Sequence, residues 1–115
     1  LIGTVTDPMV GKKIGGVNIF GGGLPLYDTK GNLIGALGVS GDSSCADHNI
    51  AWKLRHALNL DNVPGGVSLT KDDNIVNDIQ DNGKSKGGWG HPSTTEEAKT
   101  IAANLPKTHP IGPAK

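Results

Sequence analysis

The chain has 115 residues, with 11 basic and 11 acidic side chains and a sequence pI near 7.1. This length suits one small domain, and the balanced charge gives no field that would attract nucleic acid or an anionic membrane. The apolar runs are far shorter than the roughly 20 residues of a spanning helix, so we expect no membrane insertion. Aromatic residues make up 3% of the chain, which excludes an extended stacking platform for bases, and the single cysteine excludes an internal disulfide.

Two apolar segments joined by a turn predict a β-hairpin over residues 17–40. Glycines 21–23 interrupt the first segment, and the composition of residues 28–32 is typical of a tight turn. The second segment alternates between two faces. One face carries Leu33, Gly35, Leu37 and Val39, and the other carries Ile34, Ala36, Gly38 and Ser40. Because the second face is small, either a helix or a flat ligand can approach the sheet there.

The next segment predicts a helix over residues 44–58. Ser44 is the expected N-cap, with Asp47 three residues later in the manner of a capping box. Apolar residues at helical spacing predict one buried stripe, and a second stripe is mainly polar. The apolar stripe is Ala46, Ile50, Leu54, Ala57 and Leu58, and the second is His48, Trp52, Arg55 and Asn59.

Residues 61–115 read as an irregular C-terminal extension. Val67 to Leu69 is a candidate short strand, and the spacing of Ile75, Val76 and Ile79 predicts a short helix over residues 73–79. A capping box at residues 93–96 predicts a helix near 94–105. The prolines that follow exclude a regular element at the end of the chain.

The hairpin and the helix start also carry a family resemblance. The motifs are Gly22-Gly23-Leu24-Pro25-Leu26, Gly31, the run Ile34-Gly35-Ala36-Leu37-Gly38-Val39-Ser40-Gly41, and Asp47. In this order and spacing they resemble the GlcG/HbpS family of haem-binding and haem-degrading domain proteins. Two strands, a turn and a helix start must agree together, which makes the resemblance fairly specific.

The resemblance implies an α+β fold, with an antiparallel sheet flanked by helices and assembly into homo-oligomers. Residues 1–60 would then be the C-terminal half of such a domain, without its N-terminal helices and first strands. A complementary N-terminal segment or another chain would supply them. The His-Asn-Ile-Ala-Trp segment after Asp47 and the segment Trp89-Gly90-His91-Pro92 depart from the general family pattern and look like a sub-family elaboration of extracellular or periplasmic style. We therefore expect a periplasmic or secreted location, with a cytoplasmic one still open.

Two histidines are candidates for contact with a ligand or a metal. His48 follows Asp47 in the first helical turn, where the helix dipole favours the neutral imidazole that haem iron or another metal needs. The alternative is a packed histidine. His91 lies in a Trp-Gly-His-Pro segment, where it would either wall a binding pocket or belong to a rigid turn. The four histidines lack the spacing of a structural zinc site.

The glycine-rich ends of the hairpin are candidates for binding a carboxylate. Backbone amides near Gly22, Gly23, Ser40 and Gly41 would hold a haem propionate or a small hydroxy acid beside the helix start. The alternative is that these glycines serve tight turns. The pattern is not that of a nucleotide-binding loop.

Three functions follow from these observations. The first is an oligomeric protein that binds haem or a small carboxylated ligand, with His48 as the metal contact. The second is a small enzyme that uses Asp47 and His48, with His91 as a further candidate, as acid–base groups on a hydroxy acid. The third is an assembly subunit without a ligand.

Overall fold

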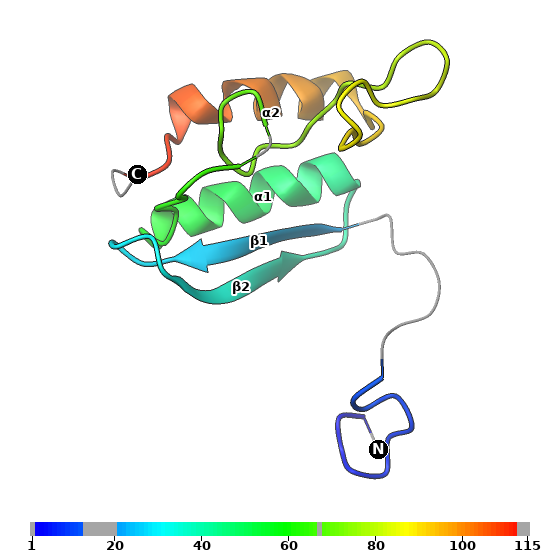
Figure 1. Ribbon diagram of the computed structural model, residues 1–115, viewed down its shortest axis with the longest axis vertical. Helices are drawn as coiled ribbons and strands as arrows, with labels where there is room; N and C mark the ends of the chain where they lie inside the picture. The colour runs from blue at the N-terminus through cyan, green and yellow to red at the C-terminus, as the bar shows by residue number, and fades with distance from the viewer. Residues whose placement is uncertain (1, 13–20, 67, 113–115) are drawn as a thin grey trace.

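The structure is a computed structural model, and it describes residues 2–12, 21–66 and 68–112. Its elements are β1 (Gly22–Tyr27), β2 (Leu33–Val39), α1 (Ser44–Ala57) and α2 (Glu96–Thr108). Figure 1 shows α1 between the β1–β2 hairpin on one side and α2 on the other. The predicted α+β class with an antiparallel sheet is confirmed. The first part of the predicted hairpin, residues 17–20, lies outside the described residues.

The hairpin is held by local hydrogen bonds at its turn. Asp28 Oδ1 accepts from the amides of Lys30 and Asn32, each at 2.9 Å, and Gly31 takes a φ of 78°, which favours glycine. The strands pair from Gly22 opposite Val39 to the bulge after Leu26. This turn fixes the register that brings the glycine-rich ends of both strands together.

The helix α1 begins at Ser44, as predicted, but its N-cap lies one residue earlier than expected. Ser43, not Ser44, is the N-cap, and its Oγ accepts from Ala46 N at 3.3 Å. Asp47 does not close a capping box, because its Oδ1 accepts from Asp42 N at 3.1 Å. The carboxylate therefore fixes the loop between β2 and α1.

The prediction that the apolar stripe of α1 is buried is wrong. Ile50 is 49% exposed, Leu54 42% and Leu58 51%, whereas the stripe with His48, Trp52 and Arg55 is buried. The extension covers this second stripe. The buried residues find partners in distant segments, so the tertiary contacts override the hydrophobic pattern.

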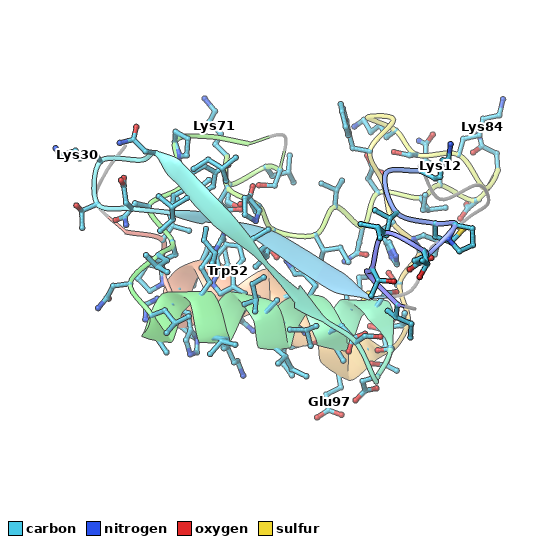
Figure 2. The ribbon with its side chains drawn as sticks, turned by 90° about the horizontal axis from the view of Figure 1, so that it is seen from below. Lys12, Lys30, Trp52, Lys71, Lys84 and Glu97 are labelled. Carbon is cyan, nitrogen blue, oxygen red and sulfur yellow. The ribbon has the colours of Figure 1, made fainter. Side chains whose placement is uncertain are left out.

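Two of these buried residues show how α1 is held. Trp52 Nε1 donates to His109 O at 2.8 Å, and Arg55 Nη1 donates to Pro25 O at 2.9 Å and to Asp73 Oδ2 at 2.7 Å. Trp52 lies in the core, between α1 and the hairpin in the view of Figure 2. The core cluster is Leu24, Ala51, Trp52 and Leu105, with Leu37, Val39, Ile101 and Ile111 packed at its margin.

Segment 68–74 forms a turn in place of the predicted strand and helix. Asp72 is buried, and its Oδ1 accepts from Ser68 Oγ and Thr70 Oγ1 at 2.8 Å and from Asn74 N at 2.9 Å. The expected helix over 73–79 is wrong, because this carboxylate offers the backbone a competing turn. Of the candidate strand 67–69, Val67 lies outside the described residues and the other two belong to the turn.

The helix α2 continues past Pro106 to Thr108, beyond the predicted end near residue 105. A proline inside a helix leaves the carbonyl four residues earlier without its donor. Here that carbonyl is Ala102 O, which accepts from Asn74 Nδ2 at 2.7 Å. The extension thus satisfies the group that Pro106 leaves unpaired.

Candidate functional site

A concavity of about 900 Å³ lies at the glycine-rich end of the hairpin. Three parts of the chain meet there: the strand ends, the first residue of α1, and the segment before α2. The lining residues are Gly21, Gly22, Gly23, Gly38, Val39, Ser40, Ser44, Gly90, His91, Pro92 and Thr94.

Two contacts bring the extension to this place. Cys45 is fully buried and its Sγ lies 3.8 Å from Pro92 O, to which it donates. Thr94 Oγ1 donates to Ser43 Oγ at 3.2 Å. Residues 92–94 are thereby held against the start of α1, so the hairpin ends and the extension line one concavity.

One wall of the concavity is bare backbone. Gly23 and Gly38 stand opposite each other in the hairpin, on the face that α1 does not cover. A Cβ at Gly38 would meet nothing within 4 Å, and one at Gly23 would meet only Leu37 O at 3.9 Å. A flat group can therefore lie directly against the strands. The sequence leaves either a helix or a flat ligand as the neighbour of this face. The helix α1 is not that neighbour, because it packs on the opposite face of the hairpin, which carries Leu37.

Gly22 has a different role from its neighbour. A Cβ at this position would lie 2.5 Å from Asp47 C and 2.6 Å from His48 N. This glycine is required for the close approach of β1 to the first turn of α1. Its side of the strand faces the helix, although its backbone also lines the concavity.

His91 is held in place from two sides. Its backbone amide donates to Val76 O at 2.7 Å, and its Nδ1 lies 2.6 Å from Pro92 O. A carbonyl oxygen only accepts, so Nδ1 must carry the proton and Nε2 keeps its lone pair. Metal-binding histidines are commonly oriented by such a bond on their other nitrogen.

The loop before His91 is organised by one carboxylate. Asp78 accepts from Ser85 Oγ at 2.6 Å and from Gly87 N at 2.8 Å, and the Ser85 bond, followed by that of Gly87, holds the pKa of Asp78 below its usual value. Ser85 Oγ also accepts from Gly90 N at 2.8 Å. Lys84 lies at the outer end of this loop, as Figure 2 shows.

The structure places the predicted pair Asp47 and His48 away from this concavity. Neither residue lines it, and they are 1% and 9% exposed. Burial, together with the charge of Arg55, lowers the pKa of His48 to about 4, so the imidazole is neutral. Among the described residues its Nε2 has no hydrogen-bond partner. His48 and His91 are therefore not brought together.

Four of the predicted ligand contacts line the concavity and two do not. Gly22, Gly23, Ser40 and His91 line it. His48 does not, and Gly41 takes a φ of 133° between β2 and α1 without lining it. In the described parts of the chain, no group of three or more His, Cys, Asp or Glu side chains is arranged to hold a metal ion.

Sequence reasoning missed the contributions of Ser44, Pro92 and Thr94. Gly38 is already a candidate in the sequence, because it belongs to the small face of the second strand. Ser44, Pro92 and Thr94 become neighbours only when residues 92–94 fold back on the helix start. No local pattern reports this contact.

The fold and the site define an α+β domain, a helix-covered hairpin with a concavity of about 900 Å³ at its glycine-rich end. Residues 5–55 match the family model for "Haem degrading protein HbpS-like". This match, over slightly less than half of the chain, confirms the predicted resemblance to the GlcG/HbpS family in this segment. No curated protein and no solved structure was found to match the chain. No described helix has the length and apolarity to cross a membrane.

Proposed function

We propose that the protein binds haem or a small carboxylated ligand in the concavity between the hairpin ends, α1 and residues 90–94. The observation that carries the proposal is the combination of a wall without side chains and an imidazole whose Nε2 is free to bind. The HbpS-like match of residues 5–55 supports a haem-related role at the level of the family.

The residues present fit a flat iron porphyrin. Gly23 and Gly38 leave room for a planar face, and His91 would supply one nitrogen ligand through Nε2. The concavity also contains Ser44, the first residue of a 14-residue helix, where the partial positive charge favours a carboxylate. Bound haem would supply the redox chemistry of its iron, and the chain would supply orientation and anion binding.

A haem titration followed by Soret absorbance tests this assignment. His91→Ala should weaken binding at least tenfold, and His48→Ala should leave the affinity unchanged if the variant is folded. Loss of haem binding in His48→Ala alone would show that His48, the residue predicted from the sequence, is the ligand in place of His91. Retained affinity in both variants would refute an imidazole contact.

A matched pair of glycine variants tests the bare wall. Gly38→Ala adds a methyl group that meets no protein atom, so it should weaken haem binding without loss of stability. Gly65→Ala is the control, because its Cβ also meets nothing within 4 Å and Gly65 does not line the concavity. Equal affinities in the two variants would argue against a ligand on this wall.

A second titration distinguishes haem from a small hydroxy acid as the ligand that carries the carboxylate. A panel of small hydroxy acids is added to the protein without haem, and the unfolding temperature is followed. Stabilisation by a hydroxy acid, lost in His91→Ala, would favour the small ligand over haem. The acid–base enzyme has less support, because Asp47 and His48 lie outside the concavity.

We propose in addition that the protein assembles with copies of itself. The exposed stripe Ile50, Leu54 and Leu58 recurs at helical spacing, and such apolar faces usually mark contact surfaces. Leu54→Glu should lower the mass measured by light scattering, whereas Lys53→Glu on the same helix should not. A monomer in the unsubstituted protein would refute the proposal.

A further inference from the structure

A pair of histidines lies at the C-terminal ends of α1 and α2, away from the concavity. The helices α1 and α2 run in the same direction, so their C-terminal ends lie at one end of the molecule (Figure 1). His56 belongs to the last turn of α1, and His109 is the C-cap of α2. Their ring centroids are 5.1 Å apart, with an interplanar angle of 79°.

The first imidazole is fixed in one tautomer. His56 Nδ1 lies 3.1 Å from Asp61 Oδ2 and 3.2 Å from Pro110 O. The carbonyl oxygen can only accept, so Nδ1 carries a proton, and in the neutral imidazole the lone pair is on Nε2. Asp61 is 5% exposed, and the side chain of His56 is 37% exposed. The ring is therefore held on its Nδ1 side and remains accessible to solvent.

The second imidazole is fixed in the same tautomer by a different route. His109 Nδ1 lies 2.8 Å from Thr108 Oγ1. The Thr108 hydroxyl donates its only hydrogen to Asn104 O at 3.2 Å, so its oxygen must accept from Nδ1. His109 therefore also keeps its lone pair on Nε2. In the described part of the chain no hydrogen bond to either Nε2 is found.

We propose that His56 and His109 bind a divalent transition-metal ion of the Zn²⁺ or Cu²⁺ class through their Nε2 atoms, with water completing the coordination. With Zn–N bonds of about 2.0–2.1 Å and a tetrahedral angle, two imidazoles on one ion have centroids about 5 Å apart. The observed separation matches this value. Both rings also have the hydrogen bond on the opposite nitrogen that orients metal-binding histidines.

The position of the pair favours a cation for a further reason. The C-terminal end of a helix carries partial negative charge, and here two such ends meet. Asp61 adds a carboxylate next to His56. The bound ion would join the end of α1 to the segment after α2, which is already tied to α1 by the Trp52 to His109 bond.

The test is a calorimetric titration of the whole chain with Zn²⁺ alone. We expect one equivalent to bind and the unfolding temperature to rise. His56→Gln and His109→Gln should each weaken binding at least tenfold. Thr100→Gln changes an exposed side chain of α2 outside the pair and should bind as the unsubstituted protein does. With Cu²⁺, electron paramagnetic resonance should show two nitrogen ligands, reduced to one in His109→Gln.

A variant that leaves both imidazoles in place separates metal binding from simple packing. Thr108→Val removes the acceptor that fixes the His109 tautomer, and loss of such a bond costs about 10–100-fold in metal affinity. Circular dichroism checks that each variant is folded. The proposal is overturned if the unsubstituted protein binds neither ion, if His109→Gln binds normally, or if Thr100→Gln loses binding.

Discussion

Gly22→Ala tests the packing of the hairpin on α1. The new Cβ would lie 2.5–2.6 Å from three backbone atoms of Asp47 and His48, whereas carbon atoms pack best at about 3.5–4.0 Å. The backbone cannot rotate away as a side chain can, so β1 must move back from α1 by about 1 Å. A gap of about 0.5–1 Å already removes a quarter to a half of the contact energy of the atoms beside it. Leu24, 3% exposed and two residues further along the strand, would lose contact with the core.

We expect the variant to lose about 1–3 kcal/mol in free energy of unfolding, which is the usual cost of overpacking. With a urea slope of about 1–3 kcal/mol/M, the midpoint of denaturation should fall by about 1 M. Gly38→Ala, at a position with no atom within 4 Å of the new Cβ, is the matched control and should keep its midpoint. Equal midpoints for Gly22→Ala and the unsubstituted protein would refute the close approach of β1 to α1.

Three further predictions concern single side chains. The pKa of His48 is about 4 in the folded state against 6.5 as its ordinary value, so the unfolded state binds more protons between these pH values. The free energy of unfolding should therefore fall by about 3 kcal/mol as the pH drops from 6.5 to 4, and His48→Gln should flatten that part of the profile. Asn74→Ala leaves Ala102 O without its donor and should lower the free energy of unfolding by about 1–3 kcal/mol, measured by urea denaturation. Asn82→Ala, at an exposed asparagine, is the control and should cause no such loss. Asp78→Ala removes the acceptor that organises the loop before His91, so it should weaken ligand binding and speed proteolysis within residues 78–90 while the urea midpoint stays unchanged.

The hairpin and the two helices could be predicted because their signals are local. The turn at 28–32 contains the Asp28 carboxylate and Gly31 that shape it. The predicted capping box at 93–96 indicated the start of α2, although the N-cap is Thr95, whose Oγ1 accepts from Ala98 N. The prediction of a helix over 73–79 is wrong because a different local interaction competes with it. Ile75 and Val76 have helical spacing, but the Asp72 carboxylate collects hydrogen bonds from residues on both sides of it.

The buried face of α1 could not be predicted from periodicity. The sequence shows two stripes, and the more apolar one is the natural candidate for the core. Arg55 is fully buried because Pro25 O and the Asp73 carboxylate lie within 2.9 Å of its guanidinium. These partners come from opposite directions along the chain. Local hydrophobicity has no information about such contacts.

Some residues of the candidate site could also be predicted from local motifs, whereas others depend on long-range contacts. The glycines at 22 and 23 belong to a motif within one strand, and the sequence pointed to them. His91 becomes a candidate in preference to His48 only because residues 92–94 contact the start of α1. The preference therefore depends on a long-range contact and on the burial of His48, and both arise only when the chain is folded.

The extension contributes to each functional feature of the molecule. It covers the polar stripe of α1, supplies His91 to the concavity, and supplies His109 to the proposed metal pair. Arg55 shows why these roles depend on one another, since its guanidinium contacts the hairpin at Pro25, the extension at Asp73 and the ring of Trp52 at 5.4 Å. A buried arginine without such partners would be strongly destabilising. The segment of residues 5–55 and the extension must therefore fold as one unit, and the two proposed sites lie at opposite ends of α1 because the extension contacts α1 at both ends.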